Sequence, residues 1–427
     1  MFTTTILTLS LLVTSTSQWP GFLAGDASQA DGPAIPVEWS PSSNIRWQAA
    51  LPGYGQSTPV VHGGVAYVTC VEGKMKEKST VVAIDIATGS EKWRYSLDSS
   101  EQVESSTYVS RAAPTPVVDD DRLICFFESG DLVCLDHDGK EMWKRSLTKE
   151  YGAFQNRFCI GASPAQDAEK VFLLIDHEGP SYAMAVNKTN GETIWKTDRS
   201  GRMSWSSPSL LEIDGKPQLV ASSAGSVDGY DPETGKQLWT YGDVGGNTAP
   251  TPIAAGKNQF LLGASPGPRG ETRDQAARSN GLMRIEMQDG KPEAKLVWQA
   301  GKALSTFASP VVHQGFGYWV NQTGVVFCFD MQTGEEKYSE RLAESCWATP
   351  VGIDDRIYFF GQKGNTTVIA AGPEHKQLAV NRLWEAEAAE TNEGDRPSFG
   401  GRTQYGAVAV GDCLLVRTGD ILYCVGK

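Results

Sequence analysis

The sequence predicts an all-β protein, an eight-bladed β-propeller with four-stranded antiparallel blades. Three observations predict this fold. A turn segment of the form Asp-x-x-Thr-Gly-x-x-x-Trp recurs along the chain, and a segment of small residues with proline recurs ahead of it. The two chain ends each carry part of a further copy, with a tryptophan segment near residue 47 and a proline-type segment near residue 406. Four-stranded units with a period of roughly 40–60 residues are typical of propellers.

The turn segment accounts for the last two strands of each unit. It occurs at 85–93, 136–143, 187–195, 231–239 and 330–338. Aspartate opens the turn, glycine tolerates a positive φ, and the aromatic residue follows in the next strand. A large aromatic side chain at one place in every unit packs one blade on the next. The expected docking positions are Trp47, Trp93, Trp143, Trp195, Trp239, Trp298, Tyr338 and Trp384.

The proline segment accounts for the first strand. It occurs at 57–61, 114–118, 162–164, 207–209, 250–252, 309–312 and 348–351, with a degenerate copy at 406–410. An apolar strand follows each copy, and a third strand then leads into the turn segment. The prolines begin their strands, where a missing N–H is tolerated.

Ring closure follows from the two incomplete copies. We expect residues 18–427 to form one propeller, in which a strand near 44–50 completes the last blade with residues 403–427. Closure removes the open edges that a linear array would expose. Two polar insertions, 265–280 and 390–402, depart from the repeat. Long loops on a rigid ring are where recognition residues concentrate, so a partner is expected there or on an exposed strand edge.

Composition and the N-terminus indicate the compartment. The net charge of −13 leaves no basic surplus for nucleic acid. Residues 1–17 contain the apolar run 6–13 followed by Ser15 and Ser17, which predicts a signal peptide and a periplasmic or secreted protein. No later apolar stretch is long enough to span a membrane. We expect a monomer.

Eight cysteines form no CxxC motif. Cys125 and Cys134 are equidistant from one turn, and Cys413 and Cys424 from another, so either pair could lie opposite in a hairpin and form a disulfide. The alternative, which we favour, is that all four are small buried apolar residues.

One set of positions predicts a site. The position three residues before each strand-opening proline, or its equivalent in the degenerate copy, lies at the top of the innermost strand. We expect Trp205, Phe307, Trp347 and Tyr405 there to rim the mouth of the central channel, with Arg111 and Arg402 as polar partners. The nearby residues that complete the candidate site are Tyr54, Gln56, Asn247 and Gln404. Aromatic rings with a few polar groups suit a small ligand or an inserted peptide. Alternatively, these side chains only plug the ring.

The repeated turn segment resembles the tryptophan-docking motif of the pyrroloquinoline-quinone (PQQ) repeat family, and the resemblance covers the chain from Trp47 to the C-terminus. It implies one of two functions. Some members are similar eight-bladed quinoprotein dehydrogenases that carry PQQ and Ca²⁺. Others are non-catalytic propellers similar to BamB.

The motifs of the dehydrogenases are missing. Those that oxidise alcohols stack the cofactor on a disulfide between adjacent cysteines, and this chain has no adjacent cysteines and no CxxCH for haem. Its five histidines are scattered. We therefore expect an exported, non-catalytic scaffold that binds a protein in the cell envelope and has no cofactor or metal site. The alternative is a dehydrogenase-like enzyme that depends on PQQ, Ca²⁺ or another metal.

Overall fold

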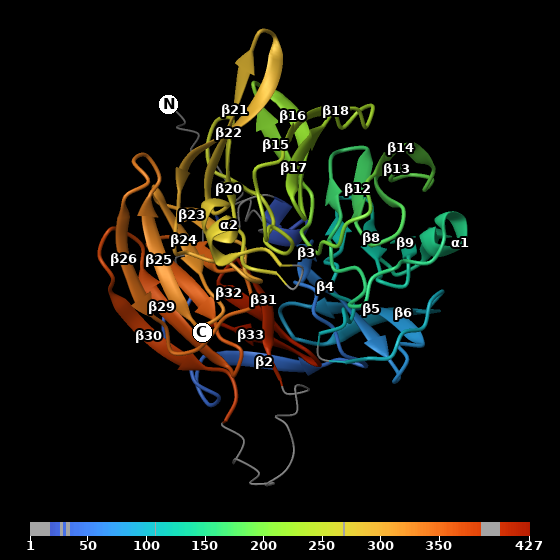
Figure 1. Cartoon of the computed structure of the whole chain (residues 1–427). Helices are drawn as coiled ribbons and strands as arrows, with labels where there is room; N and C mark the ends of the chain where they lie inside the picture. Colours follow the sequence, from blue (N-terminus) through green and yellow to red (C-terminus); the bar gives the residue numbers. More distant parts are fainter. Residues whose placement is uncertain (1–17, 26–28, 31–34, 107, 268–269, 386–401) are drawn as a thin grey trace, which may run out of the picture.

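A computed structural model of the chain describes residues 18–25, 29–30, 35–106, 108–267, 270–385 and 402–427. Within these residues the strands form eight sheets, which follow one another around a ring in chain order (Figure 1). The predicted eight-bladed propeller is therefore confirmed. The expected signal peptide, residues 1–17, lies outside the described residues.

In blades 1 to 7, four strands pair antiparallel and run in chain order from the channel outward. Blade 1 consists of β3 (Val60–His62), β4 (Val65–Glu72), β5 (Lys78–Asp85) and β6 (Glu91–Asp98), and blade 2 of β7 (Val117–Val118), β8 (Leu123–Phe126), β9 (Asp131–Leu135) and β10 (Glu141–Ser146). Blade 3 consists of β11 (Ala165–Gln166), β12 (Lys170–Ile175), β13 (Ser181–Asn187) and β14 (Thr193–Arg199). Blade 4 consists of β15 (Ser209–Ile213), β16 (Lys216–Ser223), β17 (Ser226–Tyr230) and β18 (Gln237–Tyr241). Blades 5 to 7 consist of β19 (Ile253–Ala254), β20 (Gln259–Leu262), β21 (Gly281–Gln288) and β22 (Lys291–Gln299); β23 (Val311–His313), β24 (Phe316–Val320), β25 (Val325–Asp330) and β26 (Glu336–Arg341); and β27 (Val351–Ile353), β28 (Arg356–Phe360), β29 (Asn365–Ala370) and β30 (Gln377–Arg382).

Blade 8 joins the two ends of the chain. The C-terminus supplies β31 (Gln404–Val410), β32 (Cys413–Thr418) and β33 (Ile421–Val425), and the N-terminus supplies the outer strand β2 (Ile45–Ala50). β2 pairs antiparallel with β33, and Trp47 lies opposite Cys424. The predicted closure of the ring is therefore confirmed. Two short helices, α1 (Leu147–Tyr151) and α2 (Arg273–Arg278), lie in connections between strands.

The core consists of apolar layers between neighbouring blades. One such layer packs Ile124 and Phe126 of blade 2 against Leu173 and Met184 of blade 3, all of them buried. The strands therefore bury both faces, which explains why their sequences are continuous apolar runs. In the described residues no helix is long and apolar enough to cross a membrane.

Five of the predicted tryptophans dock on the turn of the next blade. Trp195 of blade 3, for example, donates its indole N–H to the carbonyl of Pro232 at 2.9 Å. A Cβ on Gly235, whose φ is +70°, would lie 2.4 Å from that indole ring. Glycine is therefore required both for the turn and for the contact. The same arrangement holds Trp47, Trp93, Trp143 and Trp298.

The other three docking positions depart from this pattern. Trp239 donates to Gln218 of its own blade at 2.7 Å, because blade 5 replaces the glycine turn by the extended β21–β22 hairpin. Tyr338 stands edge-on to His375 in the turn of blade 7, with ring centroids 5.4 Å apart. The assignment of Trp384 is wrong: Ala379 occupies the docking position opposite Val368, and Trp384 follows the end of β30.

All eight cysteines are buried and free. The hairpin count misplaced the first pair, because Cys134 lies opposite Ile124 and Cys125 lies opposite Val133. Cys125 and Cys134 consequently face different apolar layers. In the second pair, Cys424 lies opposite Leu415 rather than Cys413.

The N-terminal segment crosses the end of the channel, which the sequence did not predict. Trp19 exchanges two backbone hydrogen bonds with Val61 of blade 1, and Pro20 accepts one from Val118 of blade 2. A 3₁₀ turn, η1 (Phe22–Gly25), then buries Leu23 among residues of blades 5 and 6. The short strand β1 (Gln29–Ala30) adds in parallel to β27 of blade 7. We call residues 18–25 and 29–30 the N-terminal strap.

Candidate functional site

The innermost strands are joined around the channel by a belt of hydroxyl groups. The residue before each strand-opening proline carries a hydroxyl in blades 1 to 7. The backbone N–H of each donates to the side-chain oxygen of the next, over distances of 2.9–3.0 Å. The members are Thr58, Thr115, Ser163, Ser207, Thr251, Ser309 and Thr349. Blade 8 has Gly406 at this position, where a Cβ would lie 2.4 Å from the Thr58 hydroxyl.

The belt has a signal in the sequence that we did not use. Serine or threonine precedes proline in every complete copy of the segment. The proline that follows cannot donate a hydrogen bond, so the hydroxyl provides the lateral bond at this level of the channel. The belt fixes the spacing of the strands that carry the mouth residues.

The predicted aromatic residues lie around one cavity of about 420 Å³ at the mouth of the channel. Trp205, Phe307, Trp347 and Tyr405 line it together with Gln56. Phe307 and Trp347 pack with ring centroids 5.2 Å apart, and Trp347 and Tyr405 with centroids 6.3 Å apart. Trp205 is held by its indole N–H, which donates to the Cys159 carbonyl at 2.9 Å. Belt hydroxyls form the lower wall.

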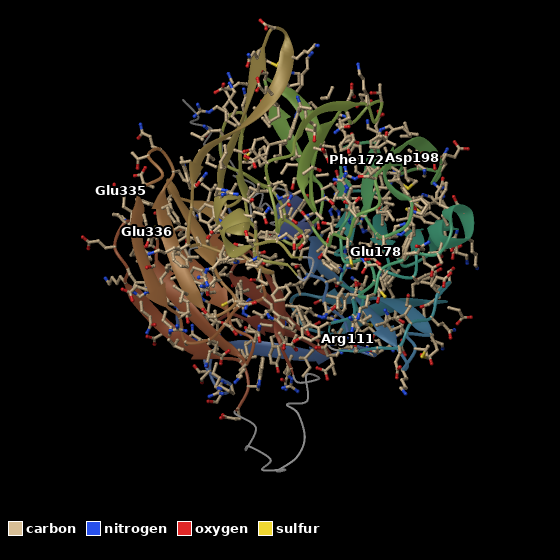
Figure 2. All side chains as sticks on the ribbon, in the orientation of Figure 1. Arg111, Phe172, Glu178, Asp198, Glu335 and Glu336 are labelled. Atoms are coloured by element: carbon tan, nitrogen blue, oxygen red, sulfur yellow. The ribbon has the colours of Figure 1, made fainter. Side chains whose placement is uncertain are left out.

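Arg111 lies behind this wall, close to blade 1 (Figure 2). Its guanidinium carbon is 3.5 Å from the centre of the Tyr54 ring, a cation–π contact. The hydroxyl oxygens of Tyr54 and Tyr405 are 2.6 Å apart. Burial is the main cause that raises the pKa of Tyr54, and repulsion from Tyr405 is the second, so the Tyr54 hydroxyl stays protonated. Nε and Nη2 of Arg111 are buried without a hydrogen bond in the described part of the chain.

A second buried cation, Arg417, adds to the positive charge behind the wall. Its donors meet only the carbonyl oxygens of Gly55, Thr69 and Gly419. Burial lowers the pKa of Arg417 to about 10, so the side chain remains charged at neutral pH. The wall near Tyr54 is therefore electropositive although the chain as a whole is acidic.

Besides Tyr54 and Arg111, which lie behind the wall, three more predicted site residues do not line the cavity. Arg402 points toward blade 8, where it contacts Trp384 and donates to the Tyr423 hydroxyl at 3.3 Å. Asn247 and Gln404 are fully buried, and their amides bond to backbone oxygens within the blades. Asn247 and Gln404 lie close to mouth residues in the sequence, but their side chains hold the ends of strands together.

The two polar insertions have different outcomes. Ser265, Pro266 and Gly267 of the first insertion line the cavity. The helix α2 follows in the same insertion and begins with a capping box between Thr272 and Gln275. Of the second insertion, 390–401 lies outside the described residues.

A buried ion pair supports the mouth loops from below. Lys76 Nζ lies 3.1 Å from Glu128 Oε1 and 2.9 Å from the Ser110 carbonyl. Glu128 also accepts hydrogen bonds from the backbone N–H of Ala112. Ser110 in turn donates its backbone N–H to the carbonyl of Phe158. Ser110 and Phe158 both line the cavity, so this pair fixes the shape of its rim.

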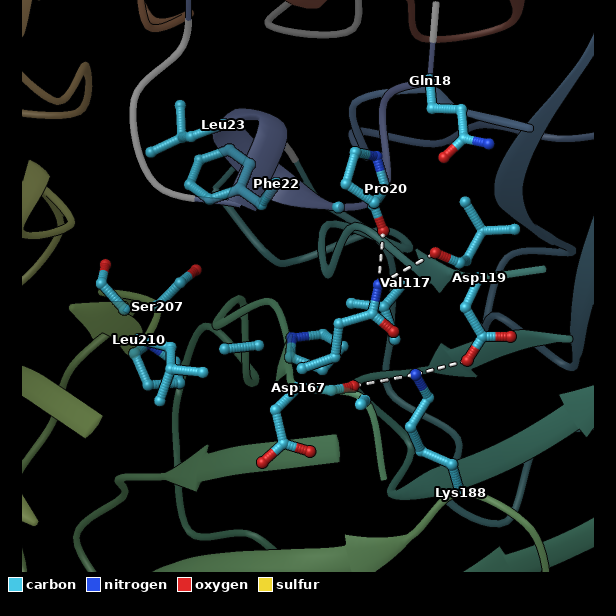
Figure 3. Close-up of a pocket in the computed structure, with 18 of the residues that line it drawn as sticks. Gln18, Pro20, Phe22, Leu23, Val117, Asp119, Asp167, Lys188, Ser207 and Leu210 are labelled. Atoms are coloured by element: carbon cyan, nitrogen blue, oxygen red, sulfur yellow. Dashed lines mark hydrogen bonds and ion pairs between the residues drawn. The ribbon is translucent and has the colours of Figure 1, made fainter. Parts of the chain in front are cut away.

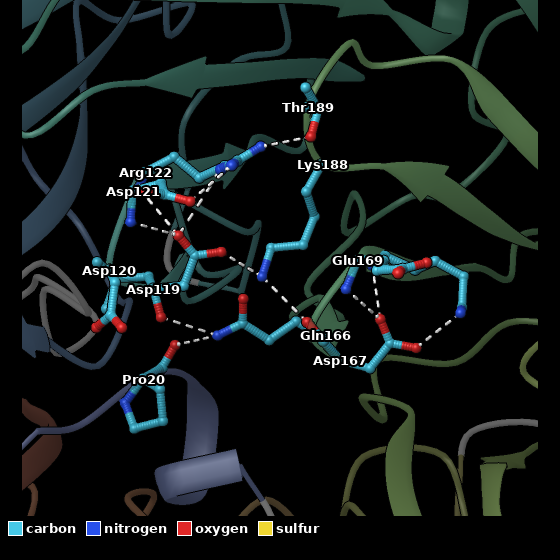
Figure 4. Close-up of polar contacts among 12 residues, drawn as sticks. Pro20, Asp119, Asp120, Asp121, Arg122, Gln166, Asp167, Glu169, Lys188 and Thr189 are labelled. Carbon is cyan, nitrogen blue, oxygen red and sulfur yellow. Dashed lines mark hydrogen bonds and ion pairs between the residues drawn. The ribbon is translucent and has the colours of Figure 1, made fainter.

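The N-terminal strap closes the cavity at its lower end. Phe22 lines the mouth cavity and also a second cavity of about 500 Å³ on the other side of the strap (Figure 3). In that second cavity the Lys188 amine pairs with Asp119, and Gln166 donates to the carbonyls of Pro20 and Val118 (Figure 4). The strap therefore blocks the channel between the two cavities.

The residues at the mouth do not fit PQQ with Ca²⁺. PQQ is a tricarboxylic quinone, and Ca²⁺ takes roughly six to eight oxygen ligands, carboxylates among them. Among the described residues that line the cavity, no side chain carries a charge. Nor do the described residues bring together three His, Cys, Asp or Glu side chains that could hold a metal ion.

Comparison with known proteins gives one family and several structures of the same fold. The family model described as outer membrane protein assembly factor BamB matches residues 30–174, 112–261 and 159–379. BamB from Moraxella catarrhalis is 14% identical with a TM-score of 0.59, covering 90% of this chain and 99% of that one. The quinohemoprotein alcohol dehydrogenase from Comamonas testosteroni is 14% identical with a TM-score of 0.61, covering 96% and 81%. The comparison with curated proteins finds no match.

Proposed function

The chain belongs to the PQQ-repeat β-propeller family, and from this premise we propose that it is an exported, non-catalytic scaffold that binds another protein at the mouth of its channel. The family model is described as an assembly factor for outer membrane proteins, which supports a place in the cell envelope. The observation that carries the proposal is the character of the mouth. It is a preformed aromatic cavity without charged lining, surrounded by exposed apolar side chains.

Two exposed aromatic side chains, Tyr108 and Phe307, line the mouth, and two further exposed apolar side chains lie on loops of blade 1 and the connection that follows it. Tyr108 is 56% exposed, Phe307 43%, Val103 37% and Met75 36%. Met75 and Val103 lie on adjacent loops, because the backbone N–H of Val103 donates to the Met75 carbonyl. Exposed apolar side chains beside a preformed pocket are typical of protein interaction sites. A partner would place an apolar side chain in the cavity and cover the loops around it.

Site-directed photocrosslinking in cells that express the chain tests this docking face. A photoreactive phenylalanine analogue at Tyr108 is expected to give a discrete adduct of one size. The same analogue at Asp214, in the exposed β15–β16 turn at the other end of the blades, is the matched control and is expected to give none. Adding Phe307→Asp should abolish the adduct, because it places a charge in an uncharged aromatic cavity.

Two results would contradict the docking proposal. One is equal crosslinking at the two faces. The other is an adduct at Tyr108 that survives Phe307→Asp in a protein that still folds, as judged by circular dichroism. Either result would mean that a partner binds elsewhere on the protein or that no partner binds.

The dehydrogenase alternative is tested separately, because structures of that fold also match the chain. Purified protein is incubated with PQQ and Ca²⁺, dialysed, and assayed for bound cofactor absorbance and for dye reduction with alcohols. We expect neither, because the mouth lacks carboxylates for Ca²⁺. Stoichiometric cofactor together with turnover would overturn the non-catalytic proposal.

Export is part of the proposal. Cleavage after the predicted signal peptide would leave Gln18 as the first residue, directly before Trp19 of the strap. N-terminal sequencing of the protein from the envelope fraction checks this. A protein that keeps residues 1–17 and remains in the cytoplasm would contradict it.

A further inference from the structure

Cys159 lies against a lysine amine in the buried cluster below the mouth. Its sulfur is 3.5 Å from Lys76 Nζ, the same nitrogen that contacts Glu128 Oε1 at 3.1 Å. All three residues are more than nine-tenths buried. Neither the aromatic cavity nor the proposed docking uses this nucleophilic pair.

The backbone around the pair is strained. Lys76, Ala112 and Cys159 have φ values of 54°, 46° and 59°, in the left-handed region that residues with a side chain avoid. Such a conformation is unfavourable for a residue with a side chain and persists only where surrounding contacts enforce it. Lys76 and Ala112 both bond to one carboxylate, Glu128, and Cys159 contacts the Lys76 amine. The nitrogen and sulfur atoms are therefore held together by the fold.

We propose that Cys159 and Lys76 form a covalent sulfur–nitrogen cross-link when the thiol is oxidised by hydrogen peroxide. In the first step the thiol sulfur takes one oxygen from the peroxide, which gives a sulfenic acid and one water. In the second step the Lys76 amine attacks that sulfur. The S–N bond forms, the S–O bond breaks, and the hydroxyl leaves as a second water.

The cluster supplies what the second step needs. A lysine amine attacks only when it has lost a proton, and the Glu128 carboxylate is placed to take it. The separation of 3.5 Å is at the edge of the range of a near-attack arrangement. Condensation of a sulfenic acid with a nearby nitrogen is established thiol chemistry. Overall, one peroxide, one thiol and one ammonium give the cross-link, two waters and one proton.

In this proposal peroxide enters through the mouth cavity, which neighbours of Cys159 in the sequence line. Phe158 and Gly161, on either side of Cys159, line the open cavity. Burial raises the pKa of the Cys159 thiol, and the neighbouring Lys76 only partly offsets this. Because the thiolate is the reactive form, the reaction is slow at neutral pH and accelerates as the pH rises. The product ties the β4–β5 turn of blade 1 to the loop that enters blade 3, and so locks the rim.

Peptide mapping of the full chain tests the cross-link. The folded protein is treated with hydrogen peroxide, alkylated, unfolded without reductant, and digested with trypsin. We expect a linked peptide that joins Lys76 to Cys159 and lacks two hydrogens relative to its parts. Cleavage after Lys76 is lost, because trypsin needs the free amine, and dithiothreitol restores it.

Two variants control for the chemistry. Cys159→Ser is expected to abolish the linked peptide. Cys134→Ser is expected to leave it unchanged, because Cys134 meets the backbone carbonyl of Lys188 rather than an amine. If Cys159→Ser fails to fold, the wild-type map alone decides. Recovery of Cys159 unmodified or as a sulfinic acid, with normal cleavage after Lys76, would overturn the proposal. So would a linked peptide with an additional oxygen, which identifies a bridge through oxygen.

Discussion

A single hydroxyl group in the channel belt holds two blades at a fixed distance. The Ser163 side chain accepts the backbone N–H of Thr115, and both residues are fully buried. Loss of this hydroxyl leaves the buried Thr115 N–H without its protein partner. An unsatisfied buried group costs more than a hydrogen bond contributes.

Ser163→Ala is therefore expected to lower the free energy of unfolding by about 1–3 kcal/mol. Ser90→Ala is the matched control, because Ser90 is exposed in a turn, and it should change stability by less than about 0.5 kcal/mol. Urea unfolding followed by tryptophan fluorescence measures both. Equal unfolding midpoints for the two variants would mean that the belt is not a structural tie.

At the scale of an element, the glycine turn works as a socket for the tryptophan of the preceding blade. Comparison of two glycines distinguishes the role of glycine in the backbone conformation from its role in packing against tryptophan. Gly235 and Gly215 both have a positive φ, of 70° and 75°, but only Gly235 lies against an indole ring. A Cβ on Gly215 would meet no atom within 4 Å.

Gly215→Ala is expected to lower the free energy of unfolding by about 1–2 kcal/mol, through backbone strain alone. Gly235→Ala adds the displacement of Trp195, which costs roughly a further 1–3 kcal/mol. Trp195 fluorescence should also shift in the second variant only. If both variants lose a similar free energy of unfolding and Trp195 fluorescence does not shift, the docking contact accommodates the added methyl group without cost.

The same elements show what the sequence could predict. The blades were predictable because each one repeats a local signal, a turn with aspartate and glycine followed by an aromatic residue. Trp384 was misassigned because it is an aromatic residue near the expected spacing, and the strand register cannot be read from the sequence. In the structure the register places Ala379 at the docking position. Within the site, the aromatic rim followed from one repeated position. The position of Arg402 and the existence of the Lys76 cluster could not be predicted in this way, because their contacts join residues far apart in the sequence.

At the scale of the whole molecule, the N-terminal strap adds a second closure to the ring. The first closure is β2 on β33, which joins the chain ends in blade 8. The second runs across the channel, from Val61 of blade 1 to β27 of blade 7. The strap also makes the mouth a blind pocket, since Phe22 separates the two cavities. The two closures are independent, so the strap can be removed while the ring stays closed.

A chain that begins at Asp31, which removes the whole strap including β1, tests this independence. Burial of Trp19 and Leu23 contributes roughly 1.5–3 kcal/mol each, and the left-handed Leu23 and Ala24 cost roughly 1–2 kcal/mol each. We expect a net loss of about 1–3 kcal/mol in the free energy of unfolding, with a single cooperative transition and an unchanged far-ultraviolet spectrum. Leu23→Ala in the full chain is the comparison: it removes the buried side chain but keeps the backbone strain, so we expect a loss of about 1.5–3 kcal/mol. Loss of the cooperative transition in the truncated chain would instead mean that the blades depend on the strap to close, and that β2 on β33 is too weak to hold the ring alone.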